Sequence, residues 1–311
     1  MIRIFDGSNQ LIEVENPKAK GSWIHLTSPT DEELQHIYRI FQGMVPMDFL
    51  TDPLDINERS RIEVDDHSVL IIARFPVFNQ SRDIAFTTQP VGIIYTEDAI
   101  LTICCQDSDI FADFINGKVK NFSTQFRSRF MLQLFLKIAL RYLSYLKEIN
   151  LRTAEIEKEL HQAMKNEELI KLLNLEKSLV FFTTSLKSNE IVMERLQKIP
   201  MIKMYPDDQD LLEEVMIENK QAIEMANIYS NILSGMMDAF ASIISNNLNV
   251  VMKFLTSVTI ILALPTLVAS IYGMNVALPF QDLPHAFAIT MFISFAVAGY
   301  TVYLFFRQKF F

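Results

Sequence analysis

Two long apolar stretches lie near the end of the chain, and everything before them is patterned differently. From Phe254 to Gln281, and again from Ala286 to Phe306, there is no charged side chain. Each stretch exceeds the ~20 residues that a helix needs to cross about 30 Å of hydrocarbon. The pattern therefore predicts two transmembrane helices within a membrane unit at 253–311, joined by a short loop at 276–286.

The pattern of the first hundred or so residues predicts several strands with one helix among them. "SPTDEEL" supplies a helix start, with Ser28 as N-cap, Pro29 at the first helical position and acids in the first turn. Runs rich in β-branched and aromatic residues, bounded by polar turns, predict the strands. These are a hairpin around 6–9, then 22–26, 68–78, 90–96 and 99–105, within an α+β domain at 1–120.

After about Asp107 the apolar positions recur with the 3.6-residue period of helices. We expect helices over 123–165 and 167–198, a break at Pro200 and Pro206, and one helix over 207–272. At ~1.5 Å per residue the last would be about 100 Å long. It must pack against copies of itself, against the 123–198 helix pair, or against both. Residues 121–252 therefore form a long helical stalk.

Charge and cysteine usage narrow the function. All but one of the 37 acids and all but two of the 28 bases precede residue 254. Such an acidic soluble part argues against nucleic acid as a partner, because phosphate binding needs clustered Lys and Arg. Cys104 and Cys105 are adjacent, so we interpret them as buried thiols. The sequence has no nucleophile–base pair or metal-ligand cluster, which argues against an enzyme.

The bases flanking the two spans predict their orientation. Lys253 precedes the first span, Arg307 and Lys309 follow the second, and the loop between them has no Lys or Arg. The positive-inside rule puts both termini in the cytoplasm and the loop outside, in a plasma (inner) membrane.

The first span carries a polar stripe at seven-residue spacing, which implies a left-handed supercoil with this stripe towards the axis. Small and hydroxylated side chains suit a water-containing lumen, but they also suit two membrane helices in close contact. Thr can in addition bond to its own helix. The stripe comprises Ser242, Asn249, Thr256, Ala263 and Ser270, with Ser245, Met252, Thr259 and Thr266 offset by three.

The end of this span resembles a known family. "YGMN" (272–275) after "SGMMDAFASIISNNLNVVMKFLTSVTIILALPTLVASI" resembles the CorA family of Mg²⁺/Co²⁺ channels, and "DINERSRIEVDDHSVLIIARFPVF" resembles its Arg-x-Arg/Lys-x-Glu strand entry. The resemblance implies a funnel-shaped homopentamer in the lipid bilayer, with Gly273, Met274 and Asn275 as selectivity filter. Its pore-lining positions fall on Asn249, Met252, Leu255, Ala263, Thr266 and Asn275, of which Met252 and Leu255 resemble a hydrophobic constriction.

Two departures from the family concern its loop and its mid-pore position. The family's Met-Pro-Glu-Leu is missing, so Asp282 is the acid that a ring at the entrance would use, and Ala263 replaces a bulkier mid-pore residue. The resemblance implies a regulatory Mg²⁺ between subunits, with Glu214 as one ligand and Asp83 as the nearest candidate partner. An exposed loop or helix acid is the plain alternative for each.

These observations predict a channel for divalent cations, most of all Mg²⁺ and also Co²⁺ or Ni²⁺, driven by the membrane potential and gated by cytosolic Mg²⁺. The alternatives are a Zn²⁺ transporter of the same superfamily, whose members typically have Gly-Val-Asn, and a membrane-tethered scaffold or sensor that does not conduct.

Overall fold

The computed structural model describes residues 1–7, 11–17, 20–162, 166–276, 278–279 and 283–308. The chain divides into two compact units, Met1–Gly235 and Met236–Phe311. The helices and strands are β1 (Ile2–Asp6), β2 (Ile12–Glu13), β3 (Ser22–Thr27), α1 (Asp31–Ile40), α2 (Met47–Thr51), the 3₁₀ turn η1 (Asp52–Leu54), β4 (Arg61–Val64), β5 (Ser68–Phe78), β6 (Phe86–Thr96), β7 (Ala99–Cys104), α3 (Asp109–Ile115), α4 (Arg127–Gln162), α5 (Asn166–Leu196), α6 (Pro206–Tyr272) and α7 (Ala286–Arg307).

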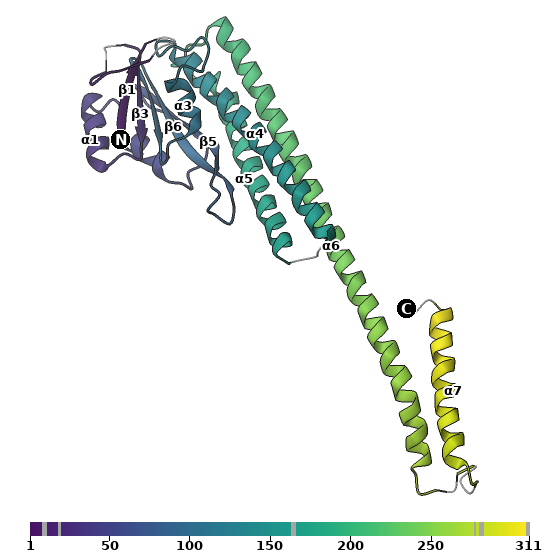
Figure 1. The fold of residues 1–311 in the computed structure, drawn as a ribbon. Helices are drawn as coiled ribbons and strands as arrows, with labels where there is room; N and C mark the ends of the chain where they lie inside the picture. The colour runs from purple at the N-terminus through teal and green to yellow at the C-terminus, as the bar shows by residue number, and fades with distance from the viewer. Residues whose placement is uncertain (8–10, 18–19, 163–165, 277, 280–282, 309–311) are drawn as a thin grey trace. The chain divides into compact units, whose positions relative to one another are not determined.

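The first unit is built around a seven-stranded sheet in the order β2-β1-β3-β7-β6-β5-β4. Its neighbouring strands are antiparallel except β3 and β7, which run parallel. Helix α1 lies on one face of the sheet, and α3, α4 and α5 lie on the other (Figure 1). Successive residues of a strand point to opposite sides of the sheet. Because β5, β6 and β7 carry runs of consecutive apolar residues, both faces of the sheet are apolar. Leu26, Leu70 and Ile94 pack towards α1 and α2.

The opposite face holds an aromatic cluster around Trp23, which is fully buried. The ring of Trp23 lies 5.0 Å from those of Phe5 and Phe130, measured between centroids. Its indole N–H donates to the Thr102 hydroxyl at 2.8 Å, and that hydroxyl also bonds to Nδ1 of His25 at 2.8 Å. Burial lowers the pKa of His25 to about 4, so its ring is neutral inside this network.

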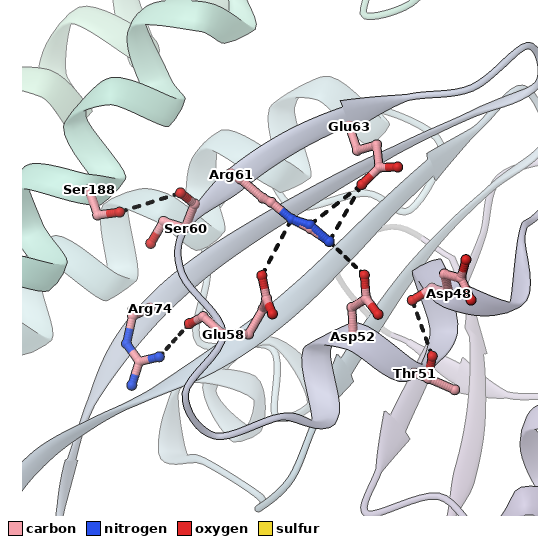
Figure 2. A network of polar contacts seen from close by, with 9 residues as sticks. All are labelled: Asp48, Thr51, Asp52, Glu58, Ser60, Arg61, Glu63, Arg74 and Ser188. Carbon is pink, nitrogen blue, oxygen red and sulfur yellow. Dashed lines mark hydrogen bonds and ion pairs between the residues drawn. The ribbon is translucent and has the colours of Figure 1, made fainter.

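A polar network joins strand β4, at the edge of the sheet, to the turn η1 and to the loop that precedes β4 (Figure 2). Arg61 on β4 bonds to Asp52 at 2.5 Å and lies 3.4 Å from carboxylate oxygens of Glu58 and Glu63. These acids raise the pKa of Arg61, the hydrogen bond to Asp52 contributing most. Arg61 and Glu63 belong to the stretch that resembles the family's strand entry, so this part of the resemblance has a structural role.

The buried Asn189 of α5 connects the helices to the sheet beyond the end of β4. Its side-chain oxygen accepts from the Arg74 backbone N–H at 2.9 Å and from the Ser60 hydroxyl at 2.8 Å, and its nitrogen donates to the Arg74 carbonyl at 2.8 Å. Tyr142 of α4 donates to the same carbonyl at 3.0 Å. Beyond the end of β4, Asn189 thus pairs with the Arg74 N–H and shares the Arg74 carbonyl with Tyr142, so these two side chains take the place of a neighbouring strand.

Most expected elements of the first unit are confirmed. Strand β5 spans 68–78 as predicted, β7 ends one residue early, and β1 pairs with β2 as the hairpin requires, although residues 8–10 lie outside the described ranges. Strand β6 begins four residues before the predicted start at 90. Elements β4, α2, η1 and α3 were not expected; each is short, and short segments give too few periods for a pattern.

The predicted start of the first helix is wrong. Ser28 has a φ of 43°, which an N-cap does not adopt. Thr30 is the N-cap instead: its hydroxyl accepts from the Glu33 N–H at 3.3 Å, and the Glu33 carboxylate accepts from the Thr30 N–H at 2.9 Å. This capping box places Pro29 before the helix rather than in it.

The long helices follow the prediction with shifted ends. Helix α4 begins at Arg127 rather than at 123, because Thr124 and Gly7 bond to each other through both backbone and hydroxyl. Helix α5 ends at Leu196, and α6 begins at Pro206 and continues for 67 residues through Pro265. In the first unit, α6 packs against α5, with the Asn219 amide donating to the Leu186 carbonyl at 3.2 Å.

Candidate functional site: the exposed face of the first membrane span

In the second unit, α6 presents one face to α7 and leaves the rest of its surface open. The helix buries Ser257 and half-buries Ile261, Leu264, Pro265 and Val268. At about 100° per residue these positions share one side of the helix, and Tyr272 continues them. This side therefore fixes where the remaining positions of α6 point.

The predicted polar stripe lies about half a turn from the α7-facing side. Each of its members is exposed in the single chain, and Met252 and Leu255, the expected constriction, are 53% and 58% exposed. Large apolar side chains and amides thus share a face that no described part of the same chain covers. The exposed members are Ser242, Ser245, Asn249, Met252, Leu255, Thr256, Thr259, Ala263, Thr266 and Ser270.

Two of the threonines on this face donate their hydroxyl hydrogens to carbonyls of the same helix. Thr259 donates to the Leu255 carbonyl at 2.8 Å, and Thr266 donates to the Leu262 carbonyl at 3.2 Å. A hydroxyl whose hydrogen bonds to its own helix keeps only acceptor lone pairs for other partners. Towards their surroundings Thr259 and Thr266 therefore only accept hydrogen bonds, which is the polarity that the waters of a hydrated cation need.

The Gly-Met-Asn segment follows the helix directly. Helix α6 ends at Tyr272, the Gly273 N–H bonds to the Ala269 carbonyl at 2.9 Å, and the Met274 N–H bonds to the Ile271 carbonyl at 3.2 Å. Gly273 is not among the residues with positive φ, so the chain leaves the helix without a left-handed cap. A Cβ on Gly273 would meet its nearest atom at 3.4 Å, so one chain alone does not require glycine here. Met274 and Asn275 are exposed.

Of the predicted regulatory and entrance residues, the structure describes Glu214 and Asp83 but not Asp282. Glu214 on α6 and Asp83 in the turn between β5 and β6 are both exposed. Asp282 lies outside the described residues. Within the ranges that the structure describes, no group of three or more His, Cys, Asp or Glu side chains could hold a metal ion.

Sequence reasoning missed a groove between α6 and α7. It has a volume of about 610 Å³ and is lined by Pro265, Ala269 and Tyr272 from α6 and by Thr290 and Ser294 from α7. Thr290 and Ser294, four residues apart on α7, were visible in the sequence as small polar residues. That they line a groove was not predictable, because hydropathy does not determine how two membrane helices are rotated against each other.

Comparison with known proteins decides the family. The CorA-like Mg²⁺ transporter protein family matches residues 18–308. This chain is a member of the CorA family. CorA proteins are transporters and not enzymes, so the chain is a membrane protein with two transmembrane helices that transports divalent cations.

Relatives within the CorA family cover nearly the whole chain. The cobalt/magnesium transport protein CorA of Methanocaldococcus jannaschii is 30% identical over 92% of this chain and 90% of its own length. The solved complete structure of the CorA magnesium transporter from the same organism matches all of this chain and 99% of its own, with a TM-score of 0.86 and 28% identity. CorA of Thermotoga maritima is 22% identical over 82% of this chain and 73% of its own.

Proposed function

We propose that the chain forms a homopentameric, funnel-shaped channel for Mg²⁺, with the exposed face of five α6 helices around an axial pore. One observation carries the proposal: the polar stripe is uncovered and lies about half a turn from the side that faces α7. Five copies with this face inward make a lumen of hydroxyl and amide acceptors, while the α7 helices surround the ring. Met252 and Leu255 form the constriction and gate by dewetting.

Asn275 of each copy supplies the selectivity filter together with Gly273 and Met274. Mg²⁺ gives up its waters reluctantly and usually keeps several of them when bound. Five neutral amide oxygens accept hydrogen bonds from those waters without stripping them. They also hold the ion weakly enough for it to leave, as conduction requires. Asp282 would concentrate cations at the entrance.

The choice of Mg²⁺ rests on the relatives and on the filter. The M. jannaschii relative is described as a cobalt/magnesium transport protein, which supports Mg²⁺ and admits Co²⁺. Met274 occupies the position at which the Zn²⁺-transporting branch of the superfamily typically has Val. Zn²⁺ transport is therefore the second candidate.

The membrane potential supplies the driving force. Moving one charge across 100 mV is worth about 2.3 kcal/mol, hence about 4.6 kcal/mol for a divalent cation moving inward. Lys253 and Arg307 flank the spans on one side, which supports a plasma membrane location with both termini cytoplasmic.

Cytosolic Mg²⁺ gates this channel through Glu214 of one subunit and Asp83 of the next. Both carboxylates are exposed, so both are free to share a metal across a subunit boundary. Mg²⁺ bound there holds the closed state. Mg²⁺ should therefore protect the wild type from limited proteolysis, and Glu214→Ala should lose that protection; equal protection in both proteins would refute the gating site.

Mg²⁺ flux into proteoliposomes, read with an entrapped indicator at an inside-negative potential, tests the function. Wild type should conduct and be blocked by hexaamminecobalt, which resembles hydrated Mg²⁺. Asn275→Ala should lower the flux about a hundredfold or more, since five water-accepting amides disappear together. Zn²⁺ flux in place of Mg²⁺ flux would favour the second candidate, and an assembled pentamer without flux of any cation would favour a scaffold.

A further inference from the structure

A groove between α6 and α7 lies in the second unit, and of the proposed pore face only Thr266 lines it. It lies entirely within residues 236–311, and Pro265, Ala269, Tyr272, Met291 and Phe295 are among its lining residues. It opens on one flank of α6, between the α7-facing side and the polar stripe. A groove of this kind in a membrane span must be filled by lipid or by protein.

The hydrogen bonds of the groove indicate an apolar occupant. Thr266 donates to the Leu262 carbonyl at 3.2 Å, Thr290 to the Ala286 carbonyl at 2.9 Å, and Ser294 to the Thr290 carbonyl at 2.9 Å. Their donors are therefore already satisfied within the chain. None of the described residues that line the groove is charged. An aliphatic side chain can enter it without leaving a polar group unpaired.

The opposite flank of the same helix carries exposed aliphatic side chains. Ile260, Leu267 and Ile271 are 39%, 57% and 42% exposed. Leu267 and Ile271 are each two residues from Ala269, so at about 100° per residue they point to the side opposite the groove. Helix α6 thus has a concave flank and a convex flank at the same height.

We infer that the groove of one copy receives the Leu267 and Ile271 side chains of the next. This rests on the proposed pentamer, in which the polar stripe faces the axis. Rotation about that axis keeps each residue number at one height and places a neighbour on both flanks of every α6. The concave flank of one copy then meets the convex flank of the next, a heterologous contact that closes into a ring.

Disulfide cross-linking of the full chain in membranes tests the contact. Ala269→Cys and Ile271→Cys in one chain point apart on their own helix and cannot join within it, because a disulfide needs Cα atoms within about 7 Å. With copper phenanthroline and air as oxidant, the double variant should give a ladder of covalent oligomers on a denaturing gel. Each single variant should remain a monomer.

A matched control uses Ala296→Cys with Ile271→Cys, because Ala296 is exposed on α7 outside the groove. This pair should not cross-link. The native thiols stay in place as background: burial raises the pKa of Cys104 to about 12 and also raises that of Cys105.

Native mass spectrometry of the wild type separates two failures. Absence of a pentamer would refute the proposed function together with this contact. An intact pentamer in which the 269/271 pair fails to cross-link, or links no better than the 296/271 pair, would refute the contact alone. Co-purified phospholipid in that intact pentamer would then identify the occupant as an acyl chain.

Discussion

The two units of this chain treat their polar groups in opposite ways. In the described part of residues 1–235, several buried polar side chains bond to groups far away in the sequence, as Asn189 does with Ser60 and Arg74 and as Trp23 does with Thr102, and only a few, such as Thr153 and Ser178, bond to carbonyls four residues earlier. In residues 236–311, hydroxyls bond to carbonyls four residues earlier on their own helix, as for Ser257, Thr259, Thr266, Thr290, Ser294 and Thr301.

This difference indicates what each unit needs in order to be complete. The first unit pairs many of its buried polar groups with each other by folding on itself, although Ser68 Oγ, Gln89 Oε1 and Gln133 Oε1 are buried without a hydrogen-bond partner among the described residues. The second satisfies only backbone and hydroxyl groups along each helix, and just 6% of the most apolar part of each candidate span is buried. Lipid and water, and in the proposed pentamer further copies, supply its remaining contacts. Substitutions of buried residues in the first unit should therefore lower the free energy of unfolding, and substitutions in the second unit should change cation transport.

The sharpest test of this contrast compares the same type of substitution, Asn→Ala, in two single variants, one in each unit. Asn189→Ala removes a buried amide that makes three hydrogen bonds, and should lower the free energy of unfolding by about 3 kcal/mol. Asn249→Ala removes an exposed amide and should change that free energy by less than about 0.5 kcal/mol. Urea unfolding followed by the fluorescence of Trp23, the chain's sole tryptophan, reports on the first unit.

Asn249→Ala should instead alter Mg²⁺ flux, because Asn249 belongs to the proposed pore face. Asn231→Ala, at another exposed position of α6, is a control for the first unit and should leave its unfolding unchanged. Equal destabilisation by Asn189→Ala and Asn249→Ala would contradict the division into a self-sufficient unit and an incomplete one.

A smaller effect should come from pH, and only through the first unit. Burial lowers the folded-state pKa of His25 to about 4, whereas an unfolded histidine titrates near 6.5. Between these values the unfolded chain binds a proton that the folded chain does not, so stability falls as pH drops from about 6.5 to about 4. At pH 5 the loss relative to neutral pH should be about 2 kcal/mol.

Urea unfolding of wild type and His25→Gln at pH 7 and pH 5 measures this contribution. The variant lacks the titrating ring, so the wild type should lose about 2 kcal/mol more between the two pH values. Carboxylates contribute equally to both proteins and cancel in the comparison. Identical losses would show that the ring of His25 is not held neutral by the fold.

The two units also differ in what their sequences reveal. The long helices and both spans were predictable, because length and a 3.6-residue period accumulate over many residues. The stripe of α6 was predictable for the same reason, and its exposure agrees with the pore proposal without testing it. The contact of Asn189 with Arg74 was not predictable, since it joins residues 115 positions apart. The cap at Thr30 was missed because Ser28 offers the same local signal.

The division of the stalk from its neighbours at 120 and 252 stays a prediction. The structure instead separates two compact units within α6, after Gly235. Helix periodicity does not change there, so nothing local in the sequence marks that position. The groove beside Pro265 shows the same limit, because it depends on how α7 is rotated against α6.

The smallest expected effect distinguishes a wet face from a dry one in the second unit. Cysteines at Thr256, Thr259, Thr266 and Asn275 should react with a water-soluble methanethiosulfonate about tenfold faster than cysteines at Ile261 and Val268, which lie on the side facing α7. Mg²⁺ should be depleted so that the pore is open, and the wild type with its native thiols gives the background rate. If the Ile261 and Val268 positions react faster instead, the stripe faces lipid or a dry helix contact, and the pore lies on another side of α6.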